Sequence, residues 1–157
     1  MTAIAYIHPT VRRRNLFAAC AAFIVFGFAM GLTYPLLSLL LERRGVSETV
    51  IGMNAAMSPL GILVFSVFIP VLARRFGART VTIVAAFSAA LLLLGYKLFP
   101  SLEAWFALRL IHGMVVSTLF VLSESWVVKY ADPGSRGKVV AIYGAALAAS
   151  FGAGPLL

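Results

Sequence analysis

The sequence has little charge, and this scarcity says most about the protein. Only 11% of the 157 residues are charged and 62% are hydrophobic, which leaves too little polar surface to solvate a globule of this size in water. A soluble helical domain would interleave charges with its apolar residues every few positions. Here the charges form short clusters between long apolar runs. This pattern excludes a soluble domain and indicates an integral membrane protein.

Cysteine and acidic residues are also scarce. Cys20 is the only cysteine, so neither an internal disulfide nor a cage of thiolates around a metal can form. Five acidic residues stand against 13 Lys and Arg, a balance that in a soluble protein would suggest a nucleic-acid partner. The clustering of the charges at the ends of apolar runs favours anionic lipid head groups instead. We therefore expect the lipid bilayer, and no nucleic acid, as a partner.

No nucleotide-binding loop, metal-ligand spacing or nucleophile with a nearby base is present in the sequence. We therefore expect no cofactor, no metal and no enzymatic activity. A protein of this kind would take its energy from a gradient.

Five apolar runs organise the chain, and each is close to the ~20 residues that a bilayer core requires. Each run must be helical, because lipid cannot satisfy an open backbone. The connections are short, so consecutive helices are expected to be antiparallel. We predict an all-α membrane bundle that follows an N-terminal segment, residues 1–15, with spans at about 16–41, 50–73, 80–99, 104–128 and 139–157.

The distribution of Lys and Arg predicts the orientation of the bundle. Three basic residues lie on one side of the membrane: Arg43, Arg44 and Lys97. Nine lie on the other side: Arg12, Arg13, Arg14, Arg74, Arg75, Arg79, Lys129, Arg136 and Lys138. This asymmetry predicts a cytoplasmic N-terminus, and we expect the protein in the inner membrane of a bacterium.

The link between the second and third runs contains Arg75, Gly77 and Arg79. It resembles the signature G-x-x-x-D-R-x-G-R-R/K of the major facilitator superfamily, in the loop between helices two and three. Glycine permits the tight reversal, and the arginines anchor the helix ends at the interface. The sequence departs from the signature at three positions, where it has Pro70, Arg74 and Ala78. In that family the acidic residue helps to hold the two halves of the transporter together. Arg74 cannot make this contact in the same way.

Three further motifs resemble the same family, in the same order along the chain. Arg109 and Gly113 resemble its R-x-x-x-G motif on the fourth helix, and Arg136 with Gly137 resembles the Arg-Gly pair that precedes the fifth. The fifth run resembles the glycine-rich motif of antiporter members, although Ser150 stands where a glycine is usual; the matching residues are Gly144, Gly152, Gly154 and Pro155.

The resemblance covers the whole chain as the first five of twelve helices. It implies a secondary transporter whose C-terminal helical half is missing from this sequence. The last run reaches Leu157 without a polar stop signal, and we therefore expect that the chain is the first part of a longer polypeptide.

Ionisable residues inside the spans are the main functional candidates, since burying each costs a few kcal/mol in lipid. Arg109 and Glu124 lie on one face of the predicted fourth helix, about 22 Å apart along its axis, so they cannot pair directly. Snorkelling of Arg109 to the outer interface and a structural pair between Glu124 and Lys129 are alternative explanations. His112 is either a titratable neighbour of Arg109 or a structural group.

The first run offers Gly27 and Gly31 at the small-xxx-small spacing that brings helices close together. Pro35 follows and frees a backbone carbonyl, which makes Tyr34 a candidate ligand contact. Asn54 is the corresponding candidate in the second run.

Our leading hypothesis is secondary transport of a small solute by alternating access, coupled to protons and directed outward as an antiporter. In this hypothesis Arg109 and Glu124 line or gate the path, Tyr34, Asn54 and His112 make secondary contacts, and Arg75, Gly77 and Arg79 support the cytoplasmic hinge. The alternatives are a membrane scaffold that transports nothing and an inactive fragment of a transporter. The sequence does not predict the identity of the solute.

Overall fold

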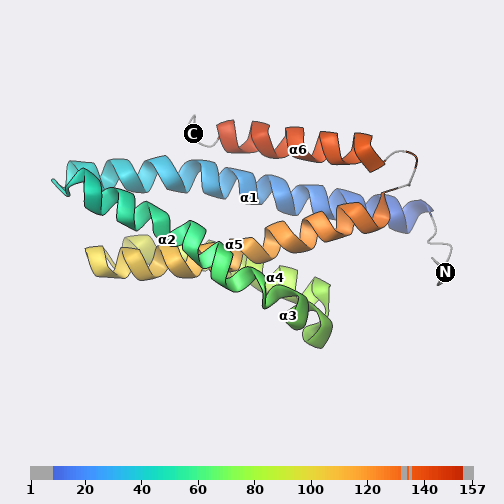
Figure 1. Cartoon of the computed structure of the whole chain (residues 1–157), viewed down its shortest axis with the longest axis horizontal. Helices are drawn as coiled ribbons and strands as arrows, with labels where there is room; N and C mark the ends of the chain where they lie inside the picture. Colours follow the sequence, from blue (N-terminus) through green and yellow to red (C-terminus); the bar gives the residue numbers. More distant parts are fainter. Residues whose placement is uncertain (1–8, 132–133, 135, 154–157) are drawn as a thin grey trace.

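The computed structural model describes residues 9–131, 134 and 136–153, and its regular structure there is entirely helical (Figure 1). The helices are α1 (Pro9–Arg43), α2 (Glu48–Ser66), α3 (Ile69–Phe76), α4 (Ala78–Leu98), α5 (Leu102–Tyr130) and α6 (Arg136–Ala153). The protein is thus an all-α bundle, as the apolar runs predict.

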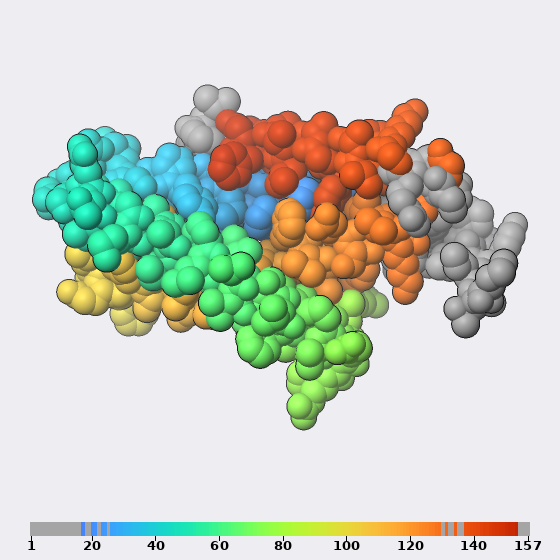
Figure 2. All heavy atoms as spheres, in the orientation of Figure 1, coloured from blue at the N-terminus to red at the C-terminus, as the bar shows by residue number. Residues whose placement is uncertain are grey.

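Consecutive long helices run in opposite directions, and α5 occupies the centre of the bundle (Figure 1). It packs against α1, α2 and α4, while α6 lies along α1, as the space-filling view also shows (Figure 2). The start of α1, the short helix α3, the end of α5 and the start of α6 lie toward one end, and the α1–α2 and α4–α5 connections lie toward the opposite end. The three strongly basic segments of the sequence therefore share one end of the bundle.

The distribution of polar and apolar side chains is that of a protein solvated by lipid. Asn54, Arg109 and His112 are buried, with at most 1% of each side chain exposed. Large apolar side chains such as Leu63 and Phe87 instead cover the outer faces, where they are 71% and 66% exposed. Water would penalise such an outer surface, whereas the hydrocarbon of a bilayer does not.

Three helices within the described residues are long and apolar enough to cross a bilayer: Glu48–Ser66, Ala78–Leu98 and Leu102–Lys129. Gly137–Ala153 is a shorter apolar helix. Helix α1 has 35 residues, more than the ~20 that a crossing needs. Five crossings remain a prediction, and the end of the fifth run, residues 154–157, lies outside the described part of the chain.

The second apolar run, 50–73, forms two helices and not one. Helix α2 ends at Ser66, and after a turn at Val67 and Phe68 the chain begins α3 at Ile69. Pro70 lies in the first turn of α3, where its missing N–H costs no helical hydrogen bond. Pro70, which stands where the family signature has a glycine, therefore lies at the start of a new helix. The corner ends at Gly77, whose φ of 83° favours glycine.

Helices α1 and α6 approach each other at two small residues. A Cβ atom on Gly27 would lie 3.0 Å from the Cβ of Ser150, and one on Gly31 would lie 2.9 Å from the backbone carbonyl carbon of Phe151. Ser150 is buried here, so Gly27 provides the room for the serine that replaces the family's usual glycine. Nearby, the rings of Phe23 and Tyr143 stack with centroids 3.7 Å apart.

Candidate functional site

Helix α5 carries two ionisable residues of the site, Arg109 and His112. Both are buried because α5 is surrounded by the other helices. Arg109 is 1% exposed and His112 is fully buried one turn further along the helix. The Arg109 side chain is therefore enclosed by the described helices, which disagrees with the snorkelling alternative. Burial of a cationic side chain among apolar helices is costly, which makes this turn of α5 the leading candidate site.

The Arg109 guanidinium has few partners. Its Nη2 donates to the backbone carbonyl of Tyr34 at 3.4 Å, and its central carbon lies 5.3 Å from the centre of the Tyr34 ring. Its Nε and Nη1 atoms are buried without a hydrogen-bond partner among the described residues. The structure thus brings Tyr34 on α1 into contact with Arg109. The sequence hypothesis placed both residues along one transport path.

Helix α2 contributes a small, polar face to the same region. Its buried residues are Asn54, Ser58 and Gly61, spaced so that they share the side of the helix that packs against α5. Ser58 donates from its hydroxyl to the backbone carbonyl of Arg109 at 3.2 Å. Both polar atoms of the Asn54 amide are buried without a partner in the described chain. The structure therefore places Asn54 one helical turn from the Arg109 contact.

An aromatic pair lies beside this region at the α4–α5 end, and neither of its members was predicted from the sequence. Trp105 is buried, and its indole N–H donates to the backbone carbonyls of Phe99 and Tyr96 at 3.0 and 3.2 Å. Tyr96 meets Trp105 edge-on at 5.9 Å and His112 at 6.3 Å between ring centroids. Trp105 could have been selected from the sequence, because it is an aromatic residue one helical turn before Arg109.

The α1–α2 connection is tied to the same aromatic pair. Arg44 donates to the backbone carbonyl of Pro100 at 2.6 Å, and its guanidinium carbon lies 4.5 Å above the Trp105 ring. These contacts join the end of α1 to the start of α5.

We use the name "polar cluster" for the buried or half-buried polar residues around Arg109 on α1, α2, α4 and α5: Tyr34, Asn54, Ser58, Tyr96, Arg109 and His112. Seven side-chain atoms of the cluster are buried without a partner in the described chain, and they belong to Asn54, Tyr96, Arg109 and His112. Buried polar atoms normally have partners, and the exceptions often mark functional sites. This set combines hydrogen-bond donors with one permanent positive charge. It suits an anionic or strongly polar ligand, and no group of acidic, His and Cys residues in the described chain could hold a metal.

Glu124 lies apart from the polar cluster. It is exposed, in the C-terminal part of α5. The preceding residue, Ser123, is buried and is hydrogen-bonded to the hydroxyl of Tyr143 on α6 at 3.0 Å. Arg109 and Glu124 therefore have different surroundings, and any shared role requires communication along α5.

The candidate hinge residues lie at the α3–α4 corner. Arg75 and Arg79 are exposed on either side of Gly77, and the guanidinium carbon of Arg75 lies 5.4 Å from the centre of the Phe76 ring. Gly137 is exposed at the start of α6. The side chain of Arg136 lies outside the described part of the structure.

The candidate packing glycines have three different environments. Gly27 and Gly31 face α6, and Gly113 faces the backbone of α2 at Ser58. A Cβ atom on Gly144 or Gly152 would meet no described atom within 4 Å. Gly154 and Pro155 lie outside the described residues. Gly61, which the sequence analysis did not single out, packs against the backbone of α5 at Leu110.

The order of the helices and of the loop motifs agrees with the comparison to known families. Residues 19–157 match the Major Facilitator Superfamily. The chain belongs to this superfamily. The match covers most of the chain, including all four motifs from the α3–α4 corner to the fifth apolar run, and it confirms the resemblance drawn from those motifs.

One relative in this superfamily is an uncharacterised MFS-type transporter, YfkF, of Bacillus subtilis strain 168. It is 29% identical over 133 residues, which are 85% of this chain and 34% of the relative. The chain thus spans about a third of the length of the curated relative that it matches. No solved structure matches the chain. Membership of the superfamily and the apolar helices together make the protein an integral membrane protein.

Proposed function

We propose that the chain forms the N-terminal part of a secondary transporter, which moves a small solute across a membrane by alternating access. The observation that carries the proposal is the polar cluster. Four helices bring a buried cation and several unpartnered polar atoms together in a chain that otherwise presents apolar side chains to lipid. Burying such a cluster costs free energy unless its atoms bind a ligand or pair with a charge from another part of the protein.

The superfamily supplies the second part of the argument. Its relative from Bacillus subtilis is named as a transporter, and the matched segment is about a third of that protein. Alternating access requires two helical units that move against each other around a shared site. In this proposal the C-terminal helices supply the other wall of the path, and the unpartnered atoms of Arg109 and His112 face the solute when the path opens.

We further propose that transport is coupled to protons and directed outward, with the N-terminus in the cytoplasm of a bacterium. Glu124 is the candidate proton carrier because it is the carboxylate within the predicted span, 104–128, of the helix that also carries Arg109. Arg75, Gly77 and Arg79 would support the movement at the α3–α4 corner.

Proton coupling can be tested with the complete protein in inverted membrane vesicles that hold a proton gradient. A panel of small organic cations, sugars and carboxylic acids is added in turn, and a pH-sensitive dye reports loss of the gradient. We expect at least one solute to dissipate the gradient in vesicles with the protein and not in vesicles without it. A panel without effect would contradict the proposed coupling.

The Glu124→Gln variant should lower this solute-dependent proton flux about tenfold or more, because the amide cannot exchange a proton. Glu103→Gln is the matched control, since Glu103 is an exposed glutamate in the first turn of the same helix. Equal loss in both variants, or no loss in Glu124→Gln, would remove Glu124 from the proton path.

A further inference from the structure

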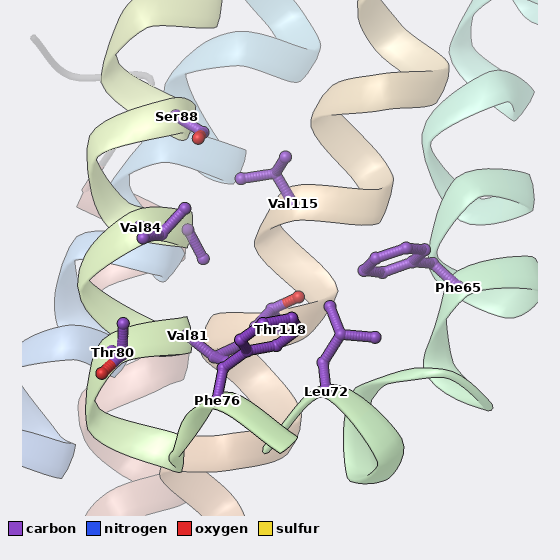
Figure 3. Close-up of a pocket in the computed structure, with 10 residues that line it drawn as sticks. Phe65, Leu72, Phe76, Thr80, Val81, Val84, Ser88, Val115 and Thr118 are labelled. Atoms are coloured by element: carbon purple, nitrogen blue, oxygen red, sulfur yellow. The ribbon is translucent and has the colours of Figure 1, made fainter. Parts of the chain in front are cut away.

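A crevice of about 360 Å³ lies on the opposite side of α5 from the α1–α6 seam, among α2, α3, α4 and α5. Figure 3 shows Leu72 and Phe76 of α3 at one end and Ser88 of α4 at the other. Its walls are almost wholly apolar. From Thr80 to Ser88 the crevice follows α4 for about 12 Å, in the direction in which that helix would cross a bilayer.

Positive charge surrounds one end of this crevice. Arg79 directly precedes Thr80, which lines it, and Arg75 lies against the ring of Phe76, which forms its end wall. Arg74 adds a third exposed cation to the same corner, which projects from the bundle in the space-filling view (Figure 2). No acidic residue occurs between Glu48 and Glu103 in the sequence, so nothing in this stretch neutralises the three arginines.

We propose that this crevice binds one anionic phospholipid. One acyl chain lies between α4 and α5 along Val84, and the phosphate lies over Arg74, Arg75 and Arg79. The apolar groove matches the acyl chain of such a lipid, and the positive charge at its end matches the phosphate. The groove also runs along α4, in the direction that an acyl chain takes in a bilayer. Because Arg74 stands where the superfamily signature has an acid, the corner is wholly basic, and it selects a head group with net negative charge.

A second groove provides an internal comparison. It lies near the other end of the bundle, where Leu36, Leu93 and Trp105 line it. It also has cations, but Arg44 is held by the Pro100 carbonyl and the Trp105 ring. Glu103 follows in the first turn of α5. An apolar groove with one remaining cation, Lys97, should accept a lipid chain without preference for an anionic head group.

The test is native mass spectrometry of the 157-residue chain and of the complete protein, each released from detergent containing equal amounts of phosphatidylglycerol and phosphatidylcholine. We expect one phosphatidylglycerol to be retained in preference to phosphatidylcholine by both proteins. Arg75→Gln should reduce this preference about fivefold, the usual contribution of one basic residue near anionic lipid. Lys97→Gln, a matched loss of one exposed cation at the other end of α4, should leave the preference unchanged.

A second pair of variants tests the groove itself. Val84→Trp fills the crevice from an exposed position on α4 and should abolish retention of the lipid, whereas Leu93→Trp, on the same helix in the second groove, should not. Circular dichroism and gel filtration establish that both variants are folded. Equal retention of the two lipids by the unaltered chain would overturn the proposal. Equal loss of lipid retention in the two paired variants would also overturn it. Retention of the lipid by the 157-residue chain and not by the complete protein would overturn it as well, because it would mean that a helix of the complete protein fills the crevice.

Discussion

Replacing Arg109 with methionine is expected to abolish transport by the complete protein and, in the 157-residue chain, to raise the thermal midpoint. Transport should fall about 100-fold or more, because a hydrogen bond to a charged group contributes up to roughly 3 kcal/mol and each 1.36 kcal/mol corresponds to a factor of ten. The measurement is uptake into vesicles of whichever solute dissipates the proton gradient.

The stability of the chain should change in the opposite direction because Arg109 is poorly compensated. Its contacts are one long hydrogen bond and a ring contact to Tyr34, while two of its nitrogen atoms are buried without a partner in the described chain. Methionine keeps much of the length and removes the charge together with those donors, each of which costs about 1–3 kcal/mol when unsatisfied. The midpoint should rise by about 2–4 °C for each kcal/mol gained.

Lys97→Met is the control for both measurements. Lys97 is an exposed cation at the end of α4, outside the polar cluster. Exposed substitutions of this kind usually change stability by no more than about 0.5 kcal/mol, and transport should continue. If Arg109→Met lowered the midpoint of the chain, the guanidinium would be a structural group. Unchanged transport would remove it from the mechanism.

The second large effect is expected at the crossing of α2 and α5, where Gly113 has no room for a side chain. A Cβ atom there would lie 2.8 Å from the backbone carbonyl carbon of Ser58. Backbone cannot move aside as a flexible side chain can, so the helices must separate and the Ser58 bond to the Arg109 carbonyl is strained. Gly113→Ala should therefore destabilise the chain by about 1–3 kcal/mol, the usual cost of overpacking.

Gly52→Ala supplies the matched comparison on α2. A Cβ atom at Gly52 meets no described atom within 4 Å, and alanine is favoured over glycine in a helix by up to about 1 kcal/mol. The two substitutions add the same methyl group, yet their effects on the thermal midpoint should have opposite signs. A midpoint that rises in both variants would mean that α2 and α5 are not in close contact at Gly113.

Long apolar runs and short basic links were sufficient to predict the helices and their antiparallel order, because lipid leaves an apolar segment few alternatives to a helix. The break of the second run was not predicted. Pro70 was treated as a departure from a signature, and only the structure shows that it begins α3. Helix propensity alone does not reveal whether a proline kinks a helix or starts a new one.

The site was predicted less completely than the fold. Tyr34, Asn54, Arg109 and His112 could be selected because polar residues are rare in the spans. Whether the Arg109 side chain is exposed or buried depends on packing between distant segments, and helical spacing within α5 does not determine it. The same limit applies to glycine: Gly31 and Gly152 look alike in sequence, but only Gly31 faces a neighbouring backbone.

The most direct test of the account is the placement of reporter fusions along the chain in a bacterial membrane. A fluorescent protein, which matures in the cytoplasm, and alkaline phosphatase, which is active outside it, are fused after each connection. The account predicts fluorescence after Arg14, Arg79 and Lys138 and phosphatase activity after Gly45 and Pro100. Phosphatase activity at any of the three basic positions would contradict a bundle whose basic ends share the cytoplasmic side.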